Sequence, residues 1–278
     1  MIKKNGKRDQ VIDAKSIQRE YIKDILRYRE LFYFLAWRDI VVRYKQTFLG
    51  VLWAIIRPLL TVAVFVFVFG KVAKLGVMTT TYPLFVLSGL LPWILFSSSL
   101  AETSNSLILN ASMISKIYFP RIILPISNIV VHFIDFLIGF FVLVFFLLLS
   151  GSGYHITILA FPVFILSIFS LCLGTGLWLS AISVRYRDFR FIVPFLIQFG
   201  VFISPVGYSS FLLPEPFQWI FFLNPLAGII EGFRWCCFGI ADPNLFLAII
   251  LSFAGNAFLL ISGFFFFRKM ESICADII

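Results

Sequence analysis

The sequence contains few charged residues, and this scarcity decides the broad class of the protein. Only 13% of its 278 residues are Asp, Glu, Lys or Arg, whereas 60% are hydrophobic. Soluble domains carry about 25% charged and about 45–50% apolar residues, so this composition excludes a soluble globular fold. Apolar stretches of about 20 residues recur along the chain, which predicts a polytopic bundle of membrane-spanning helices.

Residues that bind metals or perform acid–base chemistry are scarce as well. The four cysteines have no metal-ligand spacing and predict neither a metal site nor a disulfide framework. There are only two histidines, His132 and His155, and they fall on opposite sides of the predicted membrane domain. An integral-membrane transferase needs several His, Asp or Glu side chains near one surface, so we set this class aside.

The apolar stretches predict an all-α polytopic membrane protein with six transmembrane helices within residues 50–267. The predicted spans are Gly50–Val72, Tyr82–Leu107, Ile122–Leu149, Ile156–Val184, Phe191–Ser204 and Leu245–Phe267. Residues 205–243 are also apolar, but prolines and glycines divide them into pieces too short to cross about 30 Å of hydrocarbon. We therefore expect an external helical hairpin there, either re-entrant or interfacial.

The distribution of basic residues predicts the orientation of the chain. If the N-terminus is inside, the cytoplasmic segments hold 19 of the 23 Lys and Arg residues, and the external segments hold three. This bias places both termini in the cytoplasm. Residues 1–30 then form a basic cytoplasmic tail, suited to an anionic membrane surface rather than to nucleic acid, and residues 268–278 form a second cytoplasmic tail.

Residues 31–49, just before the first span, predict an amphipathic helix that lies on the membrane. At 100° per residue, one arc is apolar and the opposite arc is polar. The apolar arc contains Phe34, Trp37, Ile40, Val41, Tyr44 and Phe48, and the polar arc contains Asp39, Arg43, Gln46 and Thr47. The alternative is a helix packed on a soluble cytoplasmic domain, but the sequence offers no such domain.

Several short motifs occur along the chain in a characteristic order. They are Trp37-Arg38-Asp39-Ile40, Arg43-Tyr44-Lys45-Gln46-Thr47, Phe119-Pro120, Tyr186-Arg187-Asp188, Asn224-Pro225-Leu226 and Phe267-Arg268-Lys269-Met270-Glu271. From about Leu31 to the C-terminus, this order resembles the membrane subunit of type-2 ABC exporters that transport polysaccharides. Phe233 departs from the family pattern, which has Tyr before the following Arg, so a role that needs a hydroxyl group there is in doubt.

The resemblance implies a homodimer in the bacterial inner membrane that works with two copies of a cytoplasmic ABC ATPase. Its substrate would be a polysaccharide linked to undecaprenyl pyrophosphate, first of all O antigen, with capsule and teichoic acid as alternatives. The chain has no Gly-x-x-x-x-Gly-Lys-Ser/Thr loop, so we expect it to be a transporter subunit rather than an enzyme, with ATP and Mg²⁺ bound by the partner. We expect no cofactor in this chain and no nucleic-acid partner, whereas membrane lipids are expected partners. A drug or small-lipid exporter of the same architecture is the alternative function.

By the same resemblance, residues 110–120 form the cytoplasmic segment that couples to the ATPase. Its predicted contacts are Ser112, Lys116, Tyr118 and Phe119, because exposed apolar side chains in this loop favour an apolar partner. Arg187 and Asp188, after the fourth span, are further candidates. A plain cytoplasmic loop, or anchoring at headgroup level, are the alternatives.

Aromatic side chains repeat at helical spacing in three of the predicted spans. They are Phe65, Phe69, Trp93, Phe96, Phe195, Phe199 and Phe202. Ring faces offer large contact areas at low conformational-entropy cost, so these residues are candidates for a sugar translocation path. The alternative is that they face lipid or neighbouring helices.

Charged side chains within the apolar segments are functional candidates because each is costly in a membrane. Arg57, with Arg38 and Arg43 before it, is a candidate to contact the substrate headgroup, or simply to extend toward the interface. His132 and Asp135 lie three residues apart and predict a pair, for either a proton relay or a structural hydrogen bond. In the hairpin, Glu231 and Arg234 predict a second such pair.

Overall fold

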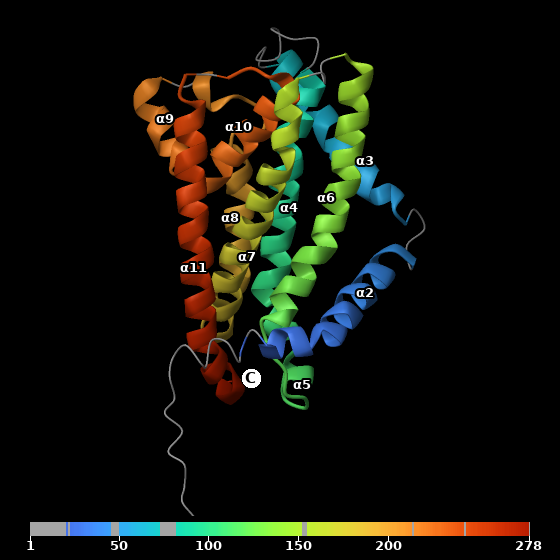
Figure 1. The fold of residues 1–278 in the computed structure, drawn as a ribbon, viewed down its shortest axis with the longest axis vertical. Helices are drawn as coiled ribbons and strands as arrows, with labels where there is room; N and C mark the ends of the chain where they lie inside the picture. Colours follow the sequence, from blue (N-terminus) through green and yellow to red (C-terminus); the bar gives the residue numbers. More distant parts are fainter. Residues whose placement is uncertain are drawn as a thin grey trace, which may run out of the picture.

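The computed structural model describes residues 21, 23–45, 50–72, 82–151, 155–212, 214–241 and 243–277. All regular elements in these ranges are helical (Figure 1), which confirms the predicted all-α membrane class. The α-helices are α2 (Arg29–Lys45), α3 (Leu52–Phe65), α4 (Tyr82–Leu109), α5 (Ala111–Ile114), α6 (Ile123–Leu149), α7 (Phe161–Arg185), α8 (Phe189–Ile203), α9 (Glu215–Phe222), α10 (Pro225–Phe238) and α11 (Leu245–Ile277). A π-helix, Val66–Val72, continues α3, and 3₁₀ turns occupy Ile156–Ala160 and Ser210–Leu212.

Five helical segments within the described ranges are long and apolar enough to cross a membrane. They are Leu52–Gly70, Tyr82–Leu109, Ile123–Leu149, Ile156–Arg185 and Leu245–Glu271, and they match the first four and the last of the predicted spans. The predicted fifth span is α8, which has only 15 residues. At 1.5 Å per residue it is about 22 Å long, less than the hydrocarbon thickness of about 30 Å. The count of six crossings therefore stays a prediction.

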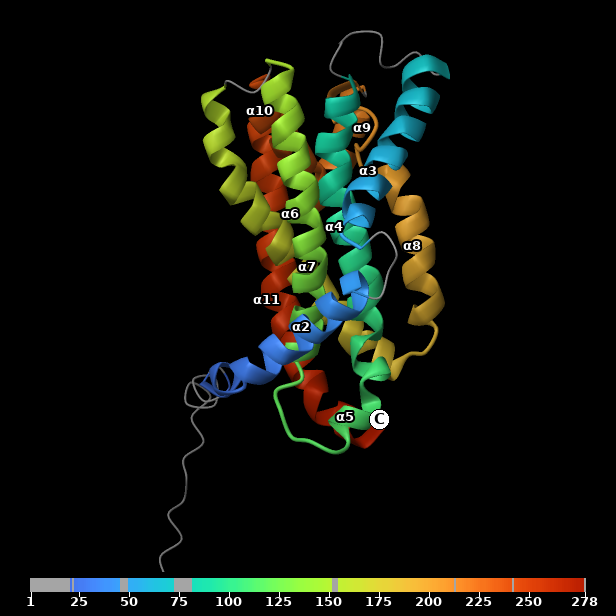
Figure 2. The ribbon, with the colours of Figure 1, turned by 90° about the vertical axis from the view of Figure 1, so that its right-hand side faces the viewer.

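The two ends of the bundle carry different elements. In Figures 1 and 2, α2, α5 and the C-terminal end of α11 lie at one end, whereas α9 and α10 lie at the other. The predicted coupling segment and the predicted hairpin are thus at opposite ends. Between Leu226 and Arg234 every residue of α10 is buried. Burial on all sides favours the re-entrant form of the hairpin over one that lies on the membrane surface.

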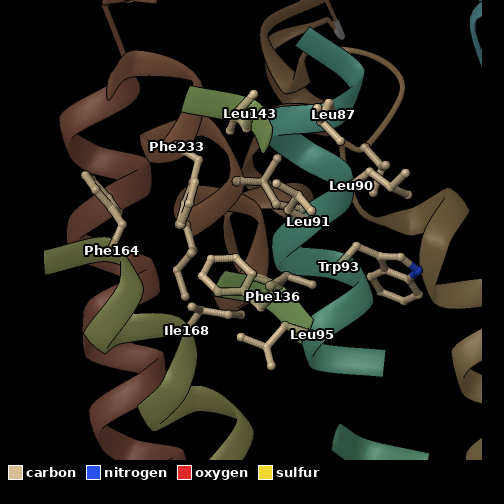
Figure 3. Close-up of a cluster of buried hydrophobic side chains, with 14 of the residues drawn as sticks. Leu87, Leu90, Leu91, Trp93, Leu95, Phe136, Leu143, Phe164, Ile168 and Phe233 are labelled. Carbon is tan, nitrogen blue, oxygen red and sulfur yellow. The ribbon is translucent and has the colours of Figure 1, made fainter. Parts of the chain in front are cut away.

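The main apolar core lies between α4, α6, α7 and α10. Figure 3 shows Phe233 of α10 between Phe164 of α7 and Phe136 of α6, with ring centroids 6.3 Å and 6.0 Å away. A Cβ atom on Gly232 would collide with the ring of Phe164, and a Cβ on Gly228 would collide with Ser252 of α11. Only glycine at these positions lets α10 enter the bundle so closely.

Helix α2 packs on the bundle by one face and leaves its large apolar side chains outside. Leu35 and Ala36 are buried, whereas Phe34 and Trp37 are 62% and 52% exposed. An exposed apolar arc of this kind is what an interfacial helix requires. The position of α2 on the membrane stays a prediction, and residues 46–49 of the predicted helix lie outside the described residues.

Candidate functional site

Five polar side chains from three helices meet where α2 crosses α4 and α6. Arg43 Nη2 lies 3.2 Å from Asp135 Oδ2, and Arg43 Nη1 lies 3.2 Å from His132 Nδ1. His132 Nε2 lies 2.9 Å from Glu102 Oε2. The hydroxyl group of Tyr44 donates a hydrogen bond to Asp135. These residues, called the polar cluster below, tie α2 to the two long helices.

The polar cluster confirms one predicted pair and adds partners that the sequence did not indicate. His132 Nδ1 lies 4.0 Å from Asp135 Oδ2, but both residues also engage Arg43 of α2. Burial and the hydrogen bond to Asp135 raise the pKa of Tyr44, so its hydroxyl group stays a proton donor. Every member thus lies within 4.0 Å of a polar group on another helix, and the structural role of His132 and Asp135 stays a prediction.

Two of the three arginines predicted to contact a lipid headgroup have protein carboxylates as partners. Arg43 turns toward Asp135, and Arg38 Nε lies 2.8 Å from Asp39 Oδ1 on the exposed side of α2. Arg57 of α3 is exposed and has no ion pair within the part of the chain that the structure describes. It is therefore the predicted headgroup residue whose charge is not already neutralised by these contacts.

A cavity of about 390 Å³ lies beside the polar cluster, between α2, α3, α4 and α6. We call it the polar cavity. Its lining combines polar and apolar side chains. Its lining comprises Arg43, Tyr44, Gly50, Trp53, Ala54, Arg57, Pro58, Leu91, Ile94, Leu95, Ser98, His132, Asp135 and Phe136. Such a mixed lining suits a ligand with both an anionic or hydroxylated part and an apolar part.

A second cavity, of about 400 Å³, lies farther along α3, α4 and α6, toward the end that carries α9 and α10. We call it the apolar cavity. Its lining comprises Leu59, Val62, Pro83, Leu84, Leu87, Phe146, Leu149 and Ser150, of which only Ser150 is polar. A cavity without charges in a membrane protein suits a hydrocarbon chain.

The predicted coupling segment forms an open surface at the other end of the bundle. Ser112, Lys116 and Tyr118 are exposed, Tyr118 by 83%. The expectation that Phe119 is also exposed is wrong, because its side chain is only 4% exposed. It packs in a second apolar cluster together with Ile123 of α6 and residues of α2, α7 and α11. Phe119 therefore holds the segment in place and offers no surface to a partner.

Glu271, near the end of α11, holds the end of the coupling segment in place through hydrogen bonds. The sequence did not indicate this role. Its Oε1 accepts the backbone N–H of Arg121 at 2.8 Å, and its Oε2 accepts the hydroxyl group of Tyr21 at 2.8 Å. Arg121 Nη1 also donates to the carbonyl oxygen of Glu271 at 2.5 Å. The motif ending in Glu271 was its only signal in the sequence. A cavity of about 610 Å³ opens between these residues and the coupling segment.

Arg187 and Asp188, the other coupling candidates, lie between α7 and α8. Both side chains are exposed. Because α4 and α7 both end at the pole of the bundle that carries α5, these residues lie at the same end as the coupling segment (Figure 2). One partner on this face has access to both loops.

The predicted pair Glu231–Arg234 is confirmed at the opposite end. Arg234 Nη1 lies 3.2 Å from Glu231 Oε1 and donates to the carbonyl oxygen of Tyr208 at 2.9 Å, while Nη2 donates to that of Val206 at 2.8 Å. Glu231 Oε1 also accepts the backbone N–H and the hydroxyl group of Ser210, each at 2.8 Å. The pair thus holds the chain that follows α8 against α10.

The seven predicted path aromatics do not form one surface in the isolated chain. Phe195, Phe199 and Phe202 are exposed along α8. Phe65 and Phe69 are half-buried with ring centroids 5.4 Å apart, and Phe96 is also half-buried. Trp93 is buried, and its ring fills the space where a Cβ atom on Gly200 of α8 would lie. In the single chain Trp93 therefore packs against α8 and is not on an open surface. In Figure 3 it points away from Phe136, at the edge of the main core.

Comparisons with known proteins match most of the chain. The family model described as "ABC-2 type transporter" matches residues 30–238, from α2 through α10. The O-antigen export system permease protein RfbA of Klebsiella pneumoniae is 32% identical over 228 residues, which are 82% of this chain and 84% of that protein. The protein of the same name from Myxococcus xanthus is 28% identical over 77% of this chain and 82% of its own length. The polysialic acid transport protein KpsM of Escherichia coli is 23% identical over 70% of this chain and 76% of its own length.

Proposed function

This chain belongs to the ABC-2 type transporter family, and from that premise we propose that it is the membrane subunit of an ABC exporter that moves a polysaccharide, first of all O antigen, out of the cytoplasm. The observation that carries the proposal is the similarity of at least 31% to O-antigen export permeases over 82–87% of the chain. The match to the family model, over residues 30–238, includes the polar cluster, the coupling segment and α10. The membrane domain fits this role because its helices are apolar and long enough to span a bilayer.

The ATPase of this exporter is a separate subunit, which binds ATP and Mg²⁺ and docks on the end that carries α5. Tyr118 supports this assignment because a tyrosine exposed by 83% gains most by burial against a partner. Ser112 and Lys116 lie in the same coupling segment, and Arg187 and Asp188, between α7 and α8, extend the surface. Two copies of the chain and two of the ATPase make the working exporter, set in the bacterial inner membrane with the docking end in the cytoplasm.

The substrate is a polysaccharide linked to undecaprenyl pyrophosphate, and the sugar chain passes along a surface of rings. The exposed phenylalanines of α8, Phe195, Phe199 and Phe202, support such a surface, which a second copy of the chain would enclose. Ring faces bind sugar C–H groups with little selectivity, so a repeating chain can slide along them. Half-buried Phe65, Phe69 and Phe96, which do not join this surface within one chain, are the predicted continuation of the path on α3, the π-helix after it and α4.

The test is removal of the protein from its own cell. We expect the polysaccharide to disappear from the cell surface and the completed undecaprenol-linked glycan to accumulate on the cytoplasmic side of the membrane. Immunoblots of surface polysaccharide and chromatography of extracted lipid-linked glycan measure the two quantities. An unchanged surface polysaccharide, together with altered drug tolerance, would instead support a drug or small-lipid exporter of the same architecture.

A further inference from the structure

The cavity of about 610 Å³ beside the coupling segment is formed by parts of the chain that are far apart in the sequence. We call it the coupling cavity. Its lining includes Tyr21 and Asp24 before α2, residues 114–120 of the coupling segment, Arg121, and Arg268 and Glu271 on α11. In Figures 1 and 2, α5 and the C-terminal end of α11 lie together at this end of the bundle, opposite α9 and α10. A partner that covers the coupling segment therefore also reaches this cavity.

Positive charge exceeds negative charge in the coupling cavity. Its lining contains three cations, Lys116, Arg121 and Arg268, and two carboxylates, Asp24 and Glu271. None of the three cations forms an ion pair within the part of the chain that the structure describes. Charges attract one another more strongly in a partly enclosed site than in open water. The cavity therefore favours one further negative charge from outside.

Contacts within the coupling cavity leave two of its cations available to a partner. Glu271 accepts hydrogen bonds from two neutral donors, the backbone N–H of Arg121 and the hydroxyl group of Tyr21, each at 2.8 Å. Arg121 in turn donates to the carbonyl oxygen of Glu271. The guanidinium of Arg268 lies 5.1 Å from the centre of the Tyr21 ring, and such stacking leaves the N–H groups at its edge for a carboxylate. Lys116 is exposed.

The lining of the coupling cavity favours a protein side chain over a phosphate group. Ile117 and Tyr118 line it and are 56% and 83% exposed. Aromatic side chains next to arginine are typical of protein–protein interfaces. Asp24 and Glu271 repel a doubly charged phosphate more strongly than a singly charged carboxylate. The chemistry of the cavity thus fits one Asp or Glu side chain of a protein partner.

We infer that the coupling cavity receives one acidic side chain of the ATPase, whose carboxylate binds Lys116 and Arg268 while Tyr118 packs beside it. This inference rests on the proposed function, because it assumes that the ATPase docks on the end that carries α5. It adds the C-terminal part of α11 to the docking surface, which the sequence assigned to the coupling segment and to Arg187 and Asp188. A movement of the docked ATPase then acts directly on α11 as well as on the segment between α4 and α6.

The ion pair is tested by the salt dependence of docking. Binding of the purified ATPase to this chain in phosphatidylcholine nanodiscs is measured by biolayer interferometry between about 50 and 500 mM NaCl. Lys116→Gln and Arg268→Gln are each expected to weaken binding about tenfold at low salt and to reduce its dependence on salt, because an interfacial ion pair is lost. Lys116→Arg keeps the charge and is expected to recover most of the affinity.

A matched control separates this site from charge in general. Arg29→Gln removes the same charge from an exposed position of α2 outside the coupling cavity, and it is expected to change binding by less than about twofold. Because Lys116 is exposed, Lys116→Gln is expected to keep the melting temperature of the wild type, which separates a loss of docking from a loss of folding. Equal effects of Lys116→Gln and Arg29→Gln on binding would overturn the inference.

Charge reversal identifies the partner group. Lys116→Glu places a carboxylate where the acidic side chain of the ATPase is expected, and it should abolish measurable binding. Each exposed Asp and Glu of the ATPase is then replaced in turn by Lys. One of these replacements is expected to restore binding to the Lys116→Glu chain at least about tenfold and to weaken binding to the wild-type chain. Failure of every replacement to restore binding would contradict a single acidic partner.

Anionic lipid is the other partner that the three cations could attract. The loss of ATPase binding caused by Lys116→Gln is expected to be the same in phosphatidylcholine nanodiscs and in a mixture with phosphatidylglycerol. A loss that appears only with phosphatidylglycerol would assign the cavity to lipid headgroups and overturn the inference. The proposed function is judged separately by surface polysaccharide after removal of the protein. Loss of surface polysaccharide, together with equal ATPase binding by the Lys116→Gln and Arg29→Gln chains, would refute the site in the cavity alone.

Discussion

Replacing Arg234 by methionine tests how much the buried pair of α10 contributes to the stability of the membrane domain. The guanidinium is 4% exposed, makes hydrogen bonds of 2.8 Å and 2.9 Å to two carbonyl oxygens, and lies 3.2 Å from Glu231. It also lies 3.8 Å above the ring of Phe85 on α4. Methionine keeps an unbranched apolar stem but removes the charge and every donor. Glu231 then stays buried without its cation.

The expected loss of stability follows from the Glu231 carboxylate that stays buried without a cation. Breaking a buried ion pair by removing one partner costs about 3–5 kcal/mol, most of it from the uncompensated charge. With about 2–4 °C of melting temperature per kcal/mol for a chain of this size, Arg234→Met is expected to lower the melting temperature by about 6–20 °C. The double variant Arg234→Met/Glu231→Gln removes both charges. Its loss is expected to be smaller than that of Arg234→Met by about 0.5–3 kcal/mol, because the amide oxygen still accepts from Ser210.

The assay is thermal unfolding of the purified protein in detergent, followed by fluorescence and size-exclusion chromatography. Wild type, both single variants and the double variant complete the cycle. A shift of less than about 2 °C for Arg234→Met would refute the reasoning, because it would mean that the guanidinium contributes less than about 1 kcal/mol. A double variant that is less stable than Arg234→Met would refute the assignment of the cost to an uncompensated Glu231.

Three further predictions concern close packing and docking. Gly232→Ala pushes a methyl group into the ring of Phe164 and is expected to lower the free energy of unfolding by about 1–3 kcal/mol in the same melting assay. Gly255→Ala is the control and is expected to cause no loss of stability, because the nearest atom to its new Cβ lies at 3.5 Å. Equal effects of the two substitutions would contradict the packing argument. Tyr118→Ala is expected to leave the melting temperature unchanged but to abolish co-purification of the ATPase. The control is Leu159→Ala, at an exposed position near the opposite end of the bundle, which is expected to leave co-purification intact. Phe119→Ala instead costs about 3–5 kcal/mol of stability, and a stable Phe119→Ala protein that merely loses the ATPase would show that Phe119 faces the partner after all.

The long helices and the pair Glu231–Arg234 are predictable from the sequence because each depends on residues that are close to one another in the chain. A run of about 20 apolar residues crosses hydrocarbon whatever its neighbours are, so five spans match their predicted positions. Glu231 and Arg234 are three residues apart, and helical geometry alone places them on one face. The short α8 is harder to place, because its apolar composition says nothing of whether 15 residues cross the bilayer.

The partners of the remaining charged and aromatic residues depend on contacts between distant segments. Arg43 meets His132 and Asp135 across about 90 positions of sequence, so nothing near Arg43 signals that its charge is neutralised inside the protein. Phe119 looks exposed as a loop residue, yet the C-terminal part of α11 packs in the same apolar cluster and helps to bury it. The sequence motifs that contain Arg43 and Phe119 single these residues out, but they do not indicate which residues they contact.

The sequence by itself determined that this protein is an apolar helical bundle with a basic N-terminal segment, because hydrophobicity and charge act residue by residue. Only the tertiary structure decided which charges neutralise one another. Arg57 is set apart from Arg38 and Arg43 solely by the carboxylates that lie near the other two. The cavities on either side of Pro58 likewise depend on how α3, α4 and α6 pack together, because residues of all three helices line both of them. Packing of that kind depends on the shapes of all three helices together, and no single segment encodes it.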